Sequence, residues 1–305
     1  MVGLFAMDER KRERIINRLE KEPMTREQLL NEYHVNKKEC RRILDSFGSQ
    51  LHFDGVLYHV NRSTLPNYDR EIPLTFDRDE KVGMVADKHM CSKYTALASL
   101  HEAYDIYAQE GVKHVFDAGD LTDGYLVYKG QLDDLVCWGE PAQREYVVKN
   151  HPFKKGITNH IIAGNHDSST LLRGGTNIVE NICKERPDMK YCGLHYARFK
   201  INDETKFDVI HDTARKAYAL SYPSQVRQRD TPPEARPDMS LAGHRHIAFY
   251  AYYNGENMFE GGCFEKSSPY MRGRGINATI ASWLTELYMR DGVIKRIKPQ
   301  LLVFK

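Results

Sequence analysis

The sequence lacks the features that mark several classes of protein. No run of 18 or more apolar residues occurs, so we expect no transmembrane helix and no membrane partner. The apolar opening MVGLFAM is too short for a secretory signal peptide. The six cysteines include no CxxC pair, which argues against a thiolate zinc site and favours reduced thiols in a cytoplasmic protein.

The sequence also has little excess charge. It contains 44 Lys and Arg against 42 Asp and Glu, a net charge of +2, which gives no global case for nucleic-acid binding. Residues 1–62 hold 12 of these basic and 10 of these acidic residues, so the whole excess lies there. Tryptophan occurs twice but histidine 13 times, and histidine can fill a core, exchange protons or bind metal. The positions of the histidines therefore decide their meaning.

Residues 1–62 have the pattern of a small helical domain. Apolar residues at helical spacing predict three helices, and Thr25 with Gln28 matches a capping box at the start of the second. Two short apolar runs joined by Asp54-Gly55 predict a β-hairpin. Three helices followed by a hairpin resemble a winged helix-turn-helix, in which the second helix of the pair enters the DNA major groove.

The third predicted helix is basic. Lys37, Lys38, Arg41 and Arg42 lie on it against Glu39. Such residues bind phosphates when a recognition helix enters DNA, so nucleic acid is the expected partner. Winged helices also mediate protein contacts, and a protein partner or dimerisation is the alternative.

The rest of the chain has the pattern of a layered α/β domain. Residues 63–80 are polar, contain two prolines and predict a linker. Across 81–305, short apolar runs ending in Asp, Asn, His and Gly alternate with helical stretches, one of them expected over 92–110. Ligand sites in such sheets lie beyond the carboxyl ends of strands. Residues 125–155 form an extra segment that we interpret as a cap over the site.

Polar side chains gather where the predicted strands end. Carboxylate and imidazole are ligands of first-row cations such as Mn, Fe and Zn. Two ligands that are two residues apart point to the same side of a strand. Eight such groups exceed one tetrahedral ion and favour two metal ions, with Asp120 central in the order. The groups are Asp87, His89, Asp120, Asn165, His166, His211, His244 and His246.

These clusters resemble the motifs of the calcineurin-like metallophosphoesterase superfamily, which are D-x-H, GD-x-x-D, GNH-D/E, a lone His and GH-x-H. All five occur in the family's order, and the resemblance covers roughly residues 80–265. It implies a β-sandwich flanked by helices. In this sequence the motifs read Asp87-Lys88-His89, Gly119-Asp120-Leu121-Thr122-Asp123, Gly164-Asn165-His166-Asp167, His211 and Gly243-His244-Arg245-His246.

The resemblance implies a role for each position. Metal one takes Asp87, His89, Asp120 and His246, and metal two takes Asp120, Asn165, His211 and His244. Both are divalent ions, with Mn favoured and Fe, Zn or Ni as alternatives. The two ions generate a bridging hydroxide that attacks phosphorus. His166 contacts a phosphate oxygen or protonates the leaving group, with Asp167 as its orienting partner. Asp123 either functions in the site or only caps a turn.

Departures from the subfamilies narrow the substrate. Protein phosphatases of the superfamily have an Arg directly after the second Asp of the GD-x-x-D motif, but here Gly124 directly follows Asp123, which disfavours a phosphoprotein substrate. Nucleases of break-repair complexes have His at the position of Asp123, so this chain is not a close copy of those nucleases. The stretches 218–225 and 263–272 are similar to phage and archaeal phosphoesterases.

Three residues are candidates for substrate binding. They are Asn165, Arg245 and Arg272. Arg245 either clamps phosphate or points to solvent. Arg272, together with Arg274 and Tyr270, either binds a nucleotide or forms a solvated loop. We therefore expect a two-metal phosphodiesterase or nuclease acting on nucleic acid. The alternatives are a phosphoesterase for small or cyclic nucleotides, and a DNA- or protein-binding regulator with a non-catalytic metal domain.

Overall fold

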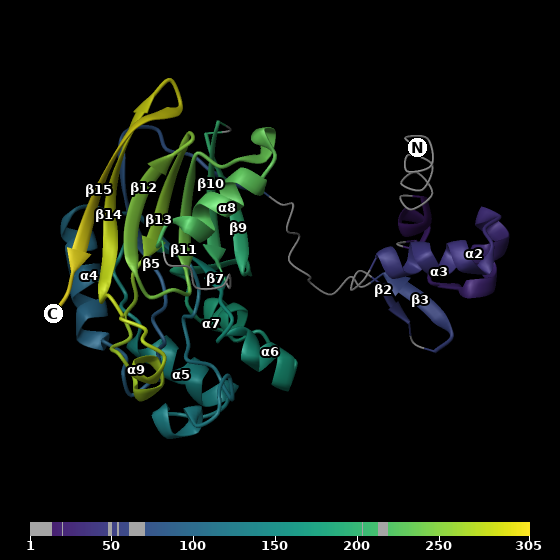
Figure 1. Ribbon diagram of the computed structural model, residues 1–305, viewed down its shortest axis with the longest axis horizontal. Helices are drawn as coiled ribbons and strands as arrows, with labels where there is room; N and C mark the ends of the chain where they lie inside the picture. Colours follow the sequence, from purple (N-terminus) through teal and green to yellow (C-terminus); the bar gives the residue numbers. More distant parts are fainter. Residues whose placement is uncertain are drawn as a thin grey trace. The chain divides into compact units, whose positions relative to one another are not determined.

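A computed structural model describes residues 14–19, 21–47, 51–53, 55–60, 71–202, 204–212 and 219–305. The chain divides into two units, Met1–Asn67 and Tyr68–Lys305 (Figure 1). Asp54, residues 63–70 of the predicted linker and Tyr218 lie outside the described residues. Within the described ranges no helix is long and apolar enough to cross a membrane.

The described residues of the first unit form three helical segments and a small sheet. The helical segments are residues 14–19, α2 (Arg26–Tyr33) and α3 (Lys37–Ser46). β1 (Met24–Thr25), β3 (Leu57–Val60) and β2 (Leu51–Phe53) form an antiparallel sheet in that order. The elements follow the predicted order, and the name winged helix stays a prediction.

Local sequence explains the helix starts of this unit. The Thr25 hydroxyl accepts a hydrogen bond from Gln28 N (3.2 Å) while the Gln28 side chain accepts one from Thr25 N (2.7 Å), which confirms the capping box. Asn36 Oδ1 accepts hydrogen bonds from the first amides of α3. The inward faces of the three helical segments form one core: Ile15, Leu19, Leu29, Cys40, Ile43, Leu44 and Phe47.

Two six-stranded sheets form the second unit (Figure 1). The first has the order β15-β14-β5-β6-β7-β8, and its strands β5 (Glu80–Val85), β6 (His114–Asp117), β7 (Thr158–Ala163) and β8 (Met189–Leu194) are parallel. β14 (Ala281–Arg290) pairs antiparallel with β5, and β15 (Val293–Val303) forms the edge. Short apolar runs bounded by polar residues predicted such buried parallel strands.

The second sheet has the order β12-β13-β11-β10-β9-β4. Its strands are β12 (Ala248–Tyr253), β13 (Glu256–Gly261), β11 (Met239–Gly243), β10 (Thr205–His211), β9 (Tyr196–Ile201) and β4 (Glu71–Leu74). β10, β11 and β13 run parallel to one another. The carboxyl ends of β10 and β11 are thus available to a ligand site, like those of β5, β6 and β7.

Alternating side chains bind the layers together. Val115 and Ile161 face the helices α4 (Leu97–Gln109), α5 (Glu140–Asn150) and α7 (Ile178–Glu185), whereas Phe116 and Ile162 face the second sheet. The second sheet carries α8 (Tyr222–Asp230), held by a hydrogen bond from Ser224 to Glu260. The predicted α/β architecture, a β-sandwich flanked by helices, is therefore confirmed.

Two predicted boundaries differ in the structure. The linker was expected to reach residue 80, but β4 pairs with β9, so residues 71–74 belong to the second sheet. The helix expected over 92–110 is α4, which begins at Leu97, because Ser92 and Thr95 form a hydrogen-bonded turn before it. Residues 125–155 contain a short 3-10 helix, η2 (Gln131–Asp134), and α5.

Candidate metal centre

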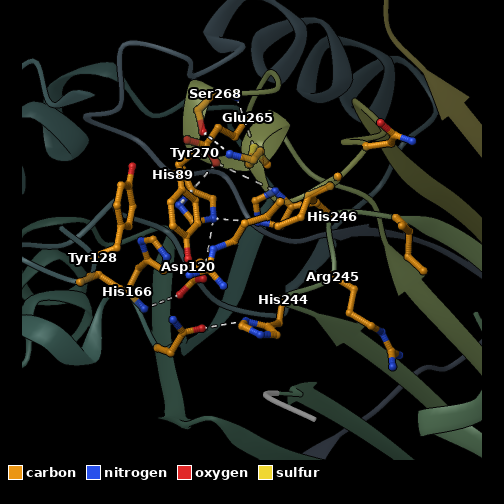
Figure 2. Close-up of a pocket in the computed structure, with 18 of the residues that line it drawn as sticks. His89, Asp120, Tyr128, His166, His244, Arg245, His246, Glu265, Ser268 and Tyr270 are labelled. Atoms are coloured by element: carbon orange, nitrogen blue, oxygen red, sulfur yellow. Dashed lines mark hydrogen bonds and ion pairs between the residues drawn. The ribbon is translucent and has the colours of Figure 1, made fainter. Parts of the chain in front are cut away.

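The candidate site lies where five strands of the two sheets end. Three of these strands belong to the first sheet and two to the second, so the site joins both sheets (Figure 2). His211 is the last residue of β10, and the other polar residues lie within four residues after their strands end. Asp87 and His89 follow β5, Asp120 follows β6, and Asn165 and His166 follow β7. In the second sheet, His211 ends β10, and His244 and His246 follow β11.

The backbone turns sharply at these residues. Asp87, His89, Asp120, His244 and His246 have φ values of 47°, 42°, 51°, 83° and 56°, in the left-handed region. Non-glycine residues seldom adopt it, and Asp and His are among those that do so most readily. The expectation that the two-residue spacings lie on strands is thus wrong, because β5 ends at Val85 and β11 at Gly243. Left-handed turns bring the side chains together instead.

One group of possible ligands is formed by Asp87, His89 and His246, whose ligand atoms all lie within 4.8 Å of one another. His89 Nε2 and His246 Nε2 are 3.1 Å apart, and His246 Nε2 is 4.0 Å from Asp87 Oδ1. All three side chains are buried. These residues are the ones expected at metal one, apart from Asp120.

A second group consists of Asp120, His211 and His244. Asp120 Oδ2 lies 3.2 Å from His211 Nε2 and 3.7 Å from His89 Nε2, so this oxygen stands between the two groups. Asn165 Oδ1 is 2.8 Å from His211 Nε2 and 2.9 Å from His244 Nδ1. The structure therefore brings together every residue that was predicted as a ligand, with Asp120 between the two groups.

The chemistry of these residues fits divalent cations. Burial raises the pKa of Asp87 to about 7 against the opposing charge of His211, so the protein's own groups compensate this carboxylate poorly. Burial lowers the pKa of His244 to about 4, which leaves a neutral imidazole ready to bind metal. Mixed nitrogen and oxygen donors without thiolate suit Mn, Fe or Zn.

Acceptors on the outer side fix two of the imidazoles. His211 Nδ1 donates to the Ala118 carbonyl oxygen (2.7 Å), and His89 Nδ1 lies 2.9 Å from Asp123 Oδ1. A carbonyl oxygen accepts only, so His211 carries a proton on Nδ1, and Nε2 is the nitrogen directed at Asp120 and Asn165. Such outer contacts hold metal-binding histidines in the required tautomer.

Asp123 contacts both His89 and His166. His166 Nδ1 donates to the Asp123 carbonyl oxygen (2.8 Å) and lies 3.4 Å from its carboxylate. Burial opposes ionisation of Asp123, but hydrogen bonds from His166 and His89 prevail and lower its pKa to about 2. Asp123 was expected either to function in the site or only to cap a turn. These contacts fit a function in the site, where Asp123 orients two histidines. With them it forms a third group whose ligand atoms lie within 4.8 Å of one another.

Asp167 does something different from the prediction. It was expected to orient His166, but its carboxylate accepts hydrogen bonds from the amides of Leu121 (3.1 Å), Thr122 (2.8 Å) and Gly164 (2.9 Å). The Thr122 hydroxyl donates a further bond of 2.8 Å. Adjacent residues in a turn direct their side chains differently, so Asp167 ties the loop after β6 to the loop after β7.

The two arginines proposed for substrate binding differ in their placement. Arg245 lines the cavity described below, but its guanidinium pairs with Glu260 and donates to Ser224 Oγ (3.2 Å), so it does not point to solvent. It points away from the histidines in Figure 2. Arg272 is exposed and does not line the cavity described below, whereas Arg274 does.

Two charged residues near the site were given no role by the sequence analysis. Lys88 is fully buried and forms an ion pair with Asp117, whose carboxylate also accepts from Gly119 N (3.2 Å). Glu265 Oε2 lies 3.9 Å from both His89 Nδ1 and His246 Nδ1. The apolar strand before Lys88 was a weak signal of its burial; nothing local indicated Glu265.

A cavity of about 690 Å³ opens above these residues. Its polar side contains His89, Asp120, Asn165, His166 and Glu265 among others. Val127 and Tyr128 from the 125–155 segment also line it, as the cap interpretation expects. The cavity size lies in the range of small-molecule sites.

Comparison with known proteins gives one distant curated relative. No family model matches the chain. The DNA polymerase II small subunit of Methanocaldococcus jannaschii is 24% identical over 283 residues, which cover 77% of this chain and 45% of that protein. The chain thus spans less than half the length of this curated relative.

Solved structures show distant likenesses. An archaeal phosphodiesterase matches 73% of this chain and 99% of its own, with 14% identity and a TM-score of 0.41. Vacuolar protein sorting 29 from Cryptosporidium parvum matches 75% of this chain and 100% of its own, with 17% identity and a TM-score of 0.40. The E. coli phosphoesterase Yfce matches 72% of this chain and 98% of its own, with 13% identity and a TM-score of 0.38. The assignment of the candidate metal site in the second unit rests on the chain's own residues.

Proposed function

We propose that the second unit hydrolyses phosphodiester bonds of nucleic acid with two divalent metal ions, Mn being preferred. The observation that carries this proposal is the placement of Asp120 Oδ2 between two groups of ligands, 3.7 Å from His89 Nε2 and 3.2 Å from His211 Nε2. When bound, two ions supply activation of water and stabilisation of the charge that develops at phosphorus. Asp87, His89 and His246 would hold one ion, and Asn165, His211 and His244 the other, with Asp120 shared.

His166 is placed to move a proton. Its Nδ1 donates to the Asp123 carbonyl oxygen, so Nε2 is the nitrogen left to donate to a phosphate oxygen or to protonate the leaving alkoxide. The ring lines the cavity and its amide donates to Asp120 Oδ1 (2.8 Å), which fixes it beside the ligands. A positioned acid of this kind typically contributes about 10²–10⁴-fold to the rate.

Nucleic acid is favoured over other phosphodiesters by the likeness to a DNA polymerase small subunit and by the basic helix of the first unit. Lys37, Lys38, Arg41 and Arg42 are all exposed on α3, whose opposite face packs into the core of that unit. We propose that these residues bind phosphates. Replacing all four by Ala in the full chain should weaken DNA binding and flatten its salt dependence. Unchanged binding would assign the unit to protein contacts or dimerisation.

Activity of the full chain tests the proposal. After removal of metal with EDTA, addition of Mn should restore cleavage of end-labelled DNA or RNA. Asp120→Asn should abolish cleavage, and His166→Ala should reduce it. Asp105→Asn is a matched control, because Asp105 lies on α4 and pairs with surface Lys154. If wild type leaves every single- and double-stranded DNA and RNA intact in Mn, the proposal fails.

The same experiment separates the alternatives. Hydrolysis confined to mononucleotides or cyclic nucleotides would identify a small-nucleotide phosphoesterase. DNA binding without hydrolysis of any phosphoester would identify a regulator with a non-catalytic metal domain.

A further inference from the structure

The cavity above the metal centre has a second wall that the chemistry of hydrolysis does not use. This wall is apolar and aromatic and faces the same space as the ligands. A phosphate bound at the ligands therefore leaves this wall for the group attached to it. The residues of the wall are Val127, Tyr128, Leu220, Pro223, Ile247, Tyr270, Met271 and Ile276.

Two tyrosines form the planar part of this wall. Tyr128 belongs to the 125–155 segment and Tyr270 to α9 (Pro269–Gly273), yet their rings stack with centroids 4.2 Å apart and an angle of 18°. The Tyr128 hydroxyl donates to Asp134 Oδ2 (3.1 Å), which holds its ring in place. Arg274 lies over the Tyr270 ring at 4.9 Å from the centroid.

The wall stands close to the reacting groups. The ring centroids of Tyr128 and His166 are 6.4 Å apart, and Figure 2 shows both tyrosines beside His89 and His166. A group attached directly to a phosphate at the ligands therefore reaches the rings. Each tyrosine has one face against the other ring and Arg274 lies over Tyr270, so a flat group in the cavity meets the outer side or the edges of this stack. Aromatic rings bind flat, unsaturated groups in both arrangements.

We propose that Tyr128, Tyr270 and Arg274 form a subsite for an unpaired nucleobase next to the scissile phosphate. The subsite deepens the proposed function and rests on it. A base inside a duplex covers both faces with its neighbours, so only an unstacked base can use these rings. Because stacking reads the face of a base and not its edge, the subsite accepts all bases. The substrate is accordingly a single-stranded segment or a nucleotide, with little sequence preference.

Two esters with the same leaving group test this subsite. Thymidine 5′-(p-nitrophenyl phosphate) and methyl p-nitrophenyl phosphate differ only in the group on the non-leaving oxygen. Wild type in Mn should cleave the thymidine ester with a kcat/KM at least about tenfold higher. Tyr270→Ala should bring the ratio of the two kcat/KM values close to one, whereas Tyr270→Phe, which keeps the ring, should preserve it.

Tyr252→Ala provides the matched control, since Tyr252 is an exposed tyrosine of β12 that does not line the cavity. It should leave the ratio unchanged. A wild-type ratio near one, or a ratio that survives Tyr270→Ala, overturns the subsite while hydrolysis of both esters still supports the phosphoesterase.

If neither ester is cleaved, the DNA and RNA assay above decides the proposed function, and binding decides the subsite. Wild type should then bind single-stranded oligothymidylate at least about tenfold more tightly than an abasic strand of equal length, and Tyr270→Ala should lose this difference. Equal affinities for the two strands overturn the subsite.

Discussion

Asp167 offers the sharpest test of how the site is held together. Its buried carboxylate accepts four hydrogen bonds, from the amides of Leu121, Thr122 and Gly164 and from the Thr122 hydroxyl. Asp167→Ala removes all four acceptor contacts and leaves three buried amides without a partner. Each buried donor without a partner costs about 1–3 kcal/mol, less where the loop relaxes toward water. We expect a loss of about 4 kcal/mol in the free energy of unfolding.

Thermal unfolding measures this loss. For a domain of this size, 1 kcal/mol corresponds to about 2–4 °C in Tm, so Asp167→Ala should unfold roughly 10 °C below wild type. Thr122→Val removes only the hydroxyl contact and keeps the side-chain volume, so it should cost about 1 kcal/mol. The ratio of the two losses tests whether the amides are the main partners of Asp167.

The same variant separates two roles for Asp167. A residue that oriented His166 would change the pH profile of kcat while leaving Tm in place. The hydrogen bonds predict the reverse, a large fall in Tm for Asp167→Ala and an altered pH profile for Asp123→Asn, which removes the carboxylate near both His89 and His166. An Asp167→Ala protein that melts with wild type but is inactive would refute this reasoning.

Three further predictions concern other buried contacts. Lys88→Met should cost about 3–5 kcal/mol in urea unfolding because it leaves Asp117 buried without its partner, and Lys88→Met/Asp117→Leu should recover most of it; additive losses would contradict the ion pair. Burial, with His114 nearby, lowers the pKa of His160 to about 3 from 6.5. The unfolded chain therefore takes a proton that the folded one refuses, so stability should fall by about 4 kcal/mol as the pH drops from 6.5 to 3, and His160→Phe should remove this contribution. Gly164→Ala should abolish hydrolysis at unchanged far-UV circular dichroism, because its Cβ would lie 2.2 Å from Asp120 Oδ1; retained activity would show that the loops can separate.

The ligands were predictable because each carries a local signal. An apolar run followed by Asp, Asn or His indicates the end of a strand. Five such strand ends predict one ligand site at the edge of the sheets, even when the pairing of the strands is unknown. His211 illustrates this: it ends β10 and follows the buried run of Val209 and Ile210. The predicted same-side placement of Asp87 and His89 was correct in outcome only, because turns and not strand alternation produce it.

The supporting contacts were not predictable because they join distant segments. Asp117 pairs with a residue 29 positions away, and Asp123 meets His89 and His166 at separations of 34 and 43. Glu265 approaches His89 from a loop after β13, 176 positions along the chain. Sequence proximity even misled in one case, since Asp167 is adjacent to His166 but turns toward other amides. β4 was missed for a related reason: a four-residue strand with a proline at its third position pairs only at a sheet edge, so it has weak local periodicity.

The geometry of the ligands explains why these distant contacts are needed. Five of the seven candidate ligands adopt left-handed backbone conformations, each of which costs a residue of this type of order 1 kcal/mol or more. Such turns persist only where other contacts hold them. Both Asp87 carboxylate oxygens accept from His244 N, at 2.9 and 2.7 Å, and Asp120 Oδ1 accepts from His166 N. These hydrogen bonds between candidate ligands and their neighbours thus stabilise the left-handed turns. Asp167 and the ion pair of Lys88 with Asp117 stabilise the loops that contain these turns. The motifs supply the metal-binding groups, and the buried contacts of Asp167 and of Lys88 with Asp117 keep those groups converged on one point.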